Sequence, residues 1–116
     1  MKTFHYIVKG MVQHVGYRFY VGMRARKLEV SGKVRNLDNG DVEVFVQSDD
    51  FKKIDEMEKI IYKGSPFGHV DEVIRDIKDM EEMDDFQMIY WLSFILWLKV
   101  ILYRKCIFKE EGYYEI

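Results

Sequence analysis

The sequence has little of what disulfide-bonded and metal-binding proteins depend on. Cys106 is the one cysteine among 116 residues, so an internal disulfide framework is excluded, and a lone thiol suits a reducing compartment. No candidate site includes Cys106, so we interpret it as an inert or surface thiol. The histidines His5, His14 and His69 lie in three separate segments, with no cysteine or carboxylate at ligand spacing beside them. The sequence therefore predicts no metal site and no cofactor.

A strong excess of one charge is also missing, because the formal net charge is −2. The distribution is uneven: residues 1–48 carry eight Lys/Arg and four Asp/Glu, whereas residues 49–85 carry six and thirteen. The basic half is consistent with attracting a small phosphorylated substrate. Nucleic acid would require a longer cationic surface. We therefore expect a small-molecule partner and no nucleic acid.

No secretory leader is visible, because residues 1–6 open directly into a strand pattern, so the expected location is the cytoplasm. The composition is that of a globular protein, with 48% hydrophobic and 33% charged residues. A chain of 116 residues is large enough for one core and too small for a second to be expected.

Hydrophobic periodicity predicts an alternation of strands and helices. Residues 4–9 alternate as a strand does, and Tyr17, Val21, Ala25 and Leu28 recur at helical spacing before Ser31–Gly32 ends the helix. The remaining expected elements are a strand over 33–37, a hairpin turn at Asp38-Asn39-Gly40, a strand over 42–47, a helix carrying Phe51, Ile54, Met57 and Ile61 and capped within 48–50, a strand with Val70, Val73, Ile74 and Ile77, and a fifth strand with Phe86, Met88 and Tyr90.

The order βαββαβ, with an extra strand, is that of the ferredoxin-like split βαβ sandwich. We therefore predict an α+β fold in which an antiparallel sheet carries two helices on one face. Many unrelated functions use this fold, so function must be argued from a site.

Residues 8–18 form the most informative stretch, because an apolar strand there passes through a short turn into a helix. The first N–H groups of a helix lack intrahelical partners and, with the positive end of the helix dipole, attract phosphate-sized anions. Arg18 in the first helical turn can add a forked clamp for two phosphate oxygens. An ordinary connection with an exposed arginine has the same layout, so the pattern alone leaves both interpretations open.

The order of residues favours the anion pocket. Residues 8–18 read V-K-G-M-V-Q-H-V-G-Y-R and resemble the acylphosphatase signature V-x-G-x-V-Q-G-V-x-[FY]-R. Residues 32–44, G-K-V-R-N-L-D-N-G-D-V-E-V, are similar to the family's G-x-V-[RK]-N and G-x-V-E-V segment, and residues 64–70, G-S-P-F-G-H-V, to its G-x-P-x-x-x-V segment. Three matches in order, within about the first 90 residues, identify the chain as a member of that family, which has the ferredoxin-like fold.

The resemblance implies a metal-independent hydrolase that cleaves acyl phosphates to a carboxylate and inorganic phosphate. Arg18 would hold the phosphoryl group, and Asn36 would orient the attacking water. The remaining phosphoryl oxygens would be bound by the N–H groups of a phosphate-binding loop made of Gln13, His14, Val15, Gly16, Tyr17 and Arg18.

His14 departs from the family signature, which has glycine at this position. If the loop needs a left-handed backbone there, a side chain costs about 1–2 kcal/mol, although histidine is among the residues more often seen in that conformation. The substitution can be neutral, or an imidazole at the rim can strengthen phosphate binding at low pH. The alternative function is a ferredoxin-like phosphate-binding or interaction module without turnover, blocked by His14 or by the C-terminal segment.

The C-terminal segment does not belong to the resemblance, so we divide the chain into a domain at 1–90 and an apolar extension at 91–116. The apolar run over 88–103 has 16 residues, interrupted by Ser93 and Lys99, whereas a bilayer-spanning helix needs about 20. A packed helix, an oligomer contact, membrane association and a non-native extension all remain open for it.

Overall fold

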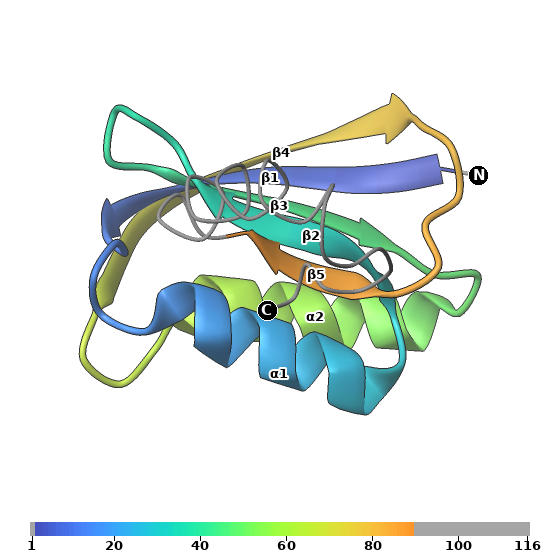
Figure 1. Ribbon diagram of the computed structural model, residues 1–116, viewed down its shortest axis with the longest axis horizontal. Coiled ribbons are helices and arrows are strands. Elements are labelled where there is room, and N and C mark those ends of the chain that lie inside the picture. The colour runs from blue at the N-terminus through green and yellow to red at the C-terminus, as the bar shows by residue number, and fades with distance from the viewer. Residues whose placement is uncertain (1, 90–116) are drawn as a thin grey trace, which may run out of the picture.

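The computed structural model describes residues 2–89, which form a five-stranded sheet with two helices on one face (Figure 1). In chain order the elements are β1 (Lys2–Met11), α1 (Tyr17–Leu28), β2 (Ser31–Asn36), β3 (Val42–Gln47), α2 (Phe51–Lys63), β4 (His69–Asp79) and β5 (Phe86–Ile89). The strands lie in the order β4-β1-β3-β2-β5. The α+β, ferredoxin-like prediction is confirmed.

The fifth strand makes the sheet mixed, whereas the sequence predicted an antiparallel one. β1, β3, β2 and β4 pair antiparallel, but β5 pairs parallel with β2. The reason is the route of the chain. β4 ends at Asp79, opposite Lys2, and this is the same end of the sheet at which β2 begins. A strand that is added beside β2 from this end must run in the direction of β2.

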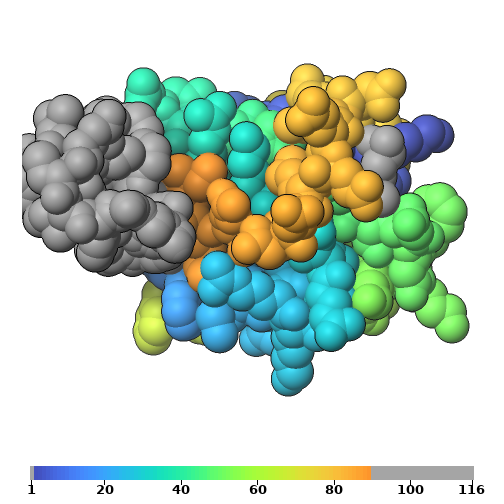
Figure 2. Space-filling model, turned by 45° about the vertical axis from the view of Figure 1, so that its right-hand side comes forward, coloured from blue at the N-terminus to red at the C-terminus, as the bar shows by residue number. Residues whose placement is uncertain are grey.

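The core lies between the sheet and the helices. Tyr6, Val8, Val34 and Val44 are fully buried on the helix-facing side of the sheet. β5 closes the core beneath α1, where an added Cβ at Gly22 would collide with the Met88 side chain. Figure 2 shows the orange residues of β5 lying directly against the blue helix α1.

The other face of β3 is more buried than its alternating pattern predicts. Glu43, Phe45 and Gln47 are buried although they point away from the helices. Gln47 donates to the hydroxyl of Thr3 at 2.8 Å and accepts from the Met83 N–H at 2.7 Å. The segment that connects β4 to β5 therefore covers this end of the sheet, and a contact between residues 36 positions apart carries no periodic signal.

The ends of the elements differ slightly from the sequence prediction. α1 ends at Leu28, and the next residue, Glu29, takes a left-handed conformation with φ 60°, so the helix stops before Ser31–Gly32. Asp50 caps α2 by accepting from the Lys52 N–H at 2.9 Å, as expected. In the β2–β3 hairpin only Gly40 has positive φ, 98°, because the turn spans 37–41 and is longer than a two-residue turn.

Residues 90–116 lie outside the described residues, and with them lie Tyr90 of the expected fifth strand, Cys106 and most of the apolar run over 88–103. Its first two residues, Met88 and Ile89, belong to β5. Within residues 2–89, neither helix is long and apolar enough to cross a membrane.

Candidate active site

Three strand ends and the start of α1 meet at one edge of the sheet. β3 is antiparallel to both β1 and β2, and β5 is parallel to β2, so β1, β2 and β5 share one direction. Their last residues, Met11, Asn36 and Ile89, therefore lie toward the same edge, where the chain turns from β1 into α1 (Figure 1). This topology brings residues 12–18 close to a strand end that follows much later in the sequence.

The loop over residues 12–16 has an unusual backbone. His14 has φ 65° and Gly16 has φ 79°, both in the left-handed region, so the strained position anticipated at His14 is present. Val12 is buried and fixes the start of the loop, while His14 is exposed. Among the described residues, the loop forms hydrogen bonds through the Gln13 side chain and the carbonyls of Val15 and Gly16, and none through the N–H groups of residues 13–16.

Arg18 lies in the first turn of α1 on the side that faces the sheet, in line with the buried residues Gly22 and Ala25. Its Nη1 donates to the Ile89 carbonyl at 3.1 Å. Ile89 is the register partner of Arg35, the neighbour of Asn36. The guanidinium group is thus held beside the end of β2.

Asn36 is the last residue of β2, and strand register fixes the direction of its side chain. It pairs with Val42, which in turn pairs with Val8. Both valines are fully buried on the helix-facing side, so the Asn36 side chain points to that side as well. Its Oδ1 is buried and has no hydrogen-bond partner among the described residues. Buried acceptors without a partner are rare in folded proteins and call for an explanation.

The Gln13 side chain joins the loop to the β2–β3 hairpin. Its Nε2 donates to the carbonyl of Leu37 at 2.7 Å and to that of Asp41 at 2.8 Å. Leu37 follows Asn36 directly. The Gln13 bond thus connects the loop to the residue after Asn36. The Arg18 bond connects the guanidinium to Ile89, the strand partner of the residue before Asn36.

The opposite side of the loop rests on the segment between α2 and β4. The hydroxyl of Ser65, which is buried, donates to the Val15 carbonyl at 3.0 Å. Tyr17 is 1% exposed and donates through its hydroxyl to the Ile61 carbonyl at 2.8 Å. Burial raises the pKa of Tyr17, with a small further contribution from Tyr20, so this phenol stays protonated and structural.

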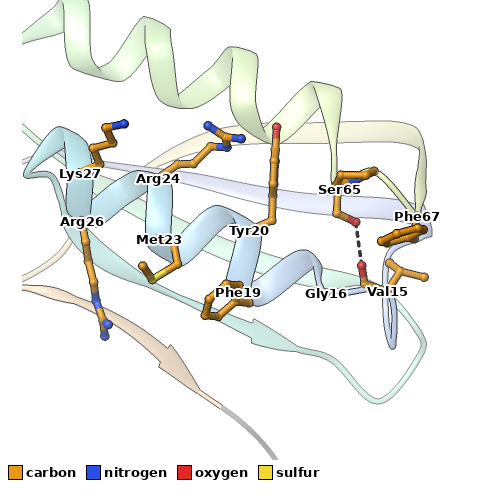
Figure 3. Close-up of a pocket in the computed structure, with 11 residues that line it drawn as sticks. Val15, Gly16, Phe19, Tyr20, Met23, Arg24, Arg26, Lys27, Ser65 and Phe67 are labelled. Carbon is orange, nitrogen blue, oxygen red and sulfur yellow. Dashed lines mark hydrogen bonds between the residues drawn. The ribbon is translucent and has the colours of Figure 1, made fainter.

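A groove of about 730 Å³ follows α1 (Figure 3). Figure 3 shows Ser65 and Phe67 at one end of it, next to Val15. Its exposed apolar residues include Phe19 and Phe67, which are 58% and 82% exposed. The groove lies on the outward side of α1, whereas Arg18 lies on the sheet-facing side. We therefore do not include it in the candidate active site.

The three described histidines lie in different parts of the fold. His5 lies on the helix-free face of the sheet, His14 in the loop, and His69 at the start of β4 beside Asp71. Within residues 2–89, no three His, Cys, Asp or Glu side chains are placed to hold a metal ion. Metal independence stays a prediction for the reaction itself.

Residues 4–88 match the family model described as Acylphosphatase. The chain belongs to the acylphosphatase family. It is 39% identical over 87 residues to an acylphosphatase from Bacillus licheniformis, covering 75% of this chain and 93% of the relative. It is 38% identical over 91 residues to one from Lactococcus lactis, covering 72% and 94%. The crystal structure of acylphosphatase from Bacillus subtilis superimposes with a TM-score of 0.72 at 31% identity, covering 78% of this chain and 100% of that one.

Family membership agrees with the three sequence matches, and the structure adds contacts that sequence reasoning missed. The hydrogen bonds of Gln13 to the hairpin, of Ser65 to Val15 and of Arg18 to Ile89 join segments 24 to 71 residues apart. Gln13 and Ser65 lie inside segments that match the family signature, and this match was the only feature of the sequence that pointed to them. Nothing in the sequence indicated the carbonyl partner of Arg18.

Proposed function

We propose that the protein hydrolyses acyl phosphates by attack of water on phosphorus, with Arg18 and the loop N–H groups holding the phosphoryl group and Asn36 orienting the water. Family membership supports acyl phosphate hydrolysis. The observation that carries the residue roles is the surroundings of Asn36. The loop is hydrogen-bonded to Leu37, the residue after Asn36, and the Arg18 guanidinium to Ile89, the strand partner of Arg35. The Oδ1 atom of Asn36 is a buried acceptor with no hydrogen-bond partner within residues 2–89.

The binding half of the site uses main-chain donors and one permanent charge. A loop with left-handed residues at His14 and Gly16 turns successive N–H groups toward one side, which is how anion-binding concavities form. A guanidinium has five N–H donors in a planar fork, so it can hold the Ile89 carbonyl and phosphoryl oxygens together. The hydrogen bond to Ile89 fixes the orientation of that fork before substrate arrives.

The reacting half needs little more than position. In the proposed step the water oxygen forms a bond to phosphorus while the bond from phosphorus to the acyl oxygen breaks, and the bonding electrons leave on the carboxylate. The leaving carboxylate is stable as an anion near neutral pH, because free carboxyl groups have a pKa of roughly 4, so no general acid is needed. One water proton passes to a phosphoryl oxygen, and the other stays on the new P–OH group.

A site that binds the phosphoryl group and positions a water, with no acid or nucleophile, suits phosphoryl transfer. Its transition state is loose, so catalysis consists largely of alignment and charge stabilisation. An amide oxygen that accepts a hydrogen bond from the attacking water restricts the water to the line of attack. It also gives the buried Asn36 Oδ1 the partner that the described residues do not supply.

The test is hydrolysis of an aromatic acyl phosphate in the presence of a chelator. We expect Arg18→Ala to lower kcat/KM by about 10²-fold or more and to weaken inhibition by inorganic phosphate, because transition-state charge loses its clamp. Asn36→Ala should lower kcat by about 10²-fold while phosphate inhibition changes little. Arg24→Ala is the matched control, because Arg24 is exposed on the same helix and stacks over the Tyr20 ring at 4.5 Å.

Undiminished turnover in either the Arg18 or the Asn36 variant would refute the role of that residue. Phosphate binding by the wild type without any turnover would favour the alternative of an inactive phosphate-binding module. Turnover that the chelator abolishes would contradict metal independence.

A further inference from the structure

The carboxamide of Gln13 is the one side chain of the loop that reaches the hairpin next to Asn36. Both of its N–H bonds are used, at 2.7 Å to the Leu37 carbonyl and at 2.8 Å to the Asp41 carbonyl. These two carbonyls belong to the residues that close the hairpin, because the Leu37 N–H donates to the Asp41 carbonyl at 2.8 Å. Gln13 therefore spans the base of the hairpin at the point where β2 ends.

We propose that Gln13 is a positioning residue that sets the distance between the phosphate-binding loop and Asn36; this inference rests on the proposed function. Its backbone belongs to the cradle for the phosphoryl group, while its side chain fixes the residue after Asn36. Gln13 thereby connects the loop that binds the phosphoryl group to the strand end that carries Asn36, the residue proposed to orient the water.

A second contact limits how the hairpin can move. Lys9 Nζ lies 2.7 Å from Asp41 Oδ2, which ties the end of β1 to the same hairpin. The Asp41 side chain is 12% exposed and that of Lys9 is 38% exposed, so solvent screens this pair and its strength is modest. The Gln13 bonds have the greater effect on geometry, because two short bonds from one planar group fix both distance and orientation.

The expected consequence of losing the carboxamide is a fault in alignment with little change in binding. The loop N–H groups and Arg18 remain in Gln13→Leu, so the Kd for inorganic phosphate should stay within about threefold. A displacement of about 1 Å between reacting groups can cost about 10²-fold in rate. We therefore expect kcat to fall by roughly 10- to 100-fold.

The experiment measures kcat for an aromatic acyl phosphate and Kd for inorganic phosphate in Gln13→Leu, with Gln87→Leu as the matched control. Gln87 is exposed on β5, and within residues 2–89 its amide forms a single hydrogen bond, to the Asp85 carboxylate at 3.4 Å. In an Asn36→Ala background, Gln13→Leu should lower kcat no further, because the residue through which it acts is gone. Gln13→Met keeps the length of the side chain without the donors and without adding charge, and it should reproduce the loss if the leucine variant does not fold.

Three results would overturn the proposal: an unchanged kcat, a phosphate Kd that rises as much as kcat falls, or reductions that multiply with Asn36→Ala. Amide hydrogen exchange tests the role of Gln13 even if the proposed function is wrong. If the wild type shows no turnover, exchange at the Leu37 N–H should still become at least tenfold faster in Gln13→Leu than in Gln87→Leu. An unchanged exchange rate would also reject the role of Gln13.

Discussion

His14 holds a backbone conformation in which a side chain is strained. Its φ of 65° lies in the region that glycine occupies freely, and the family signature has glycine at this position. The imidazole is exposed, so the strain arises in the backbone and the side chain is not forced against the core. The loop therefore has a left-handed backbone at the position where the family signature has glycine, although histidine fits that backbone less well.

We expect His14→Gly to stabilise the protein. Relief of the left-handed strain is worth about 1–2 kcal/mol, and the added freedom of glycine in the unfolded chain takes back about 0.5–1 kcal/mol. The free energy of unfolding, measured with urea, should rise by up to about 1.5 kcal/mol. His69→Gly, at an exposed position of β4 without positive φ, is the control and should lose stability. A loss of stability in His14→Gly would show that its side chain contributes more than its backbone costs.

At the scale of the elements, the helix-free face of the sheet holds a charged cluster that spans four strands. His5 on β1 lies between Glu43 on β3, at 2.8 Å, and Asp76 on β4, at 2.9 Å. Arg35 on β2 lies 2.6 Å from the other oxygen of Glu43. Burial raises the pKa of Glu43, but the hydrogen bonds from His5 and Arg35 outweigh it, so the pKa falls below its usual 4.5.

A lowered carboxyl pKa stabilises the folded state only while the group is ionised. The contribution of Glu43 is complete above pH 4.5 and disappears as pH falls through the lower pKa of the folded state. Glu43→Gln should therefore cost about 1–3 kcal/mol at neutral pH, because the neutral amide keeps one acceptor oxygen and turns an NH2 group toward the second of the two donors, His5 and Arg35. Urea unfolding from pH 7 down to about pH 3 should show the difference from wild type shrinking. A difference that does not change with pH would contradict this account.

Periodicity was sufficient to predict every described element but not their cross-strand contacts. The spacing of apolar residues located β1 to β4 and both helices, since burial of one face leaves a local signal. The direction of β5 and the burial of Glu43, Phe45 and Gln47 depend on segments that are distant in sequence. The same holds at the site: the matched segments named Arg18 and Asn36, whereas the Gln13 bonds needed the hairpin to be placed beside the loop.

At the scale of the whole molecule, residues 2–89 contain all parts of the proposed machinery, and the family model ends at residue 88. The division into a domain at 1–90 and an extension at 91–116 stays a prediction, because residues 90–116 lie outside the described residues. Membrane association and self-association through residues 88–103, two of the open alternatives, have no support in residues 2–89. In the proposed mechanism, the fold directs three parallel strand ends to one edge, where the loop, the Arg18 guanidinium and the Asn36 amide lie near one another.

The central claim is that water attacks phosphorus and not the acyl carbon. Hydrolysis of an aromatic acyl phosphate in ¹⁸O-labelled water tests this directly, with both products analysed by mass spectrometry. We predict one labelled oxygen in each inorganic phosphate and none in the carboxylate. Label in the carboxylate would mean attack at the carbonyl carbon, and it would contradict the roles proposed for Arg18 and Asn36.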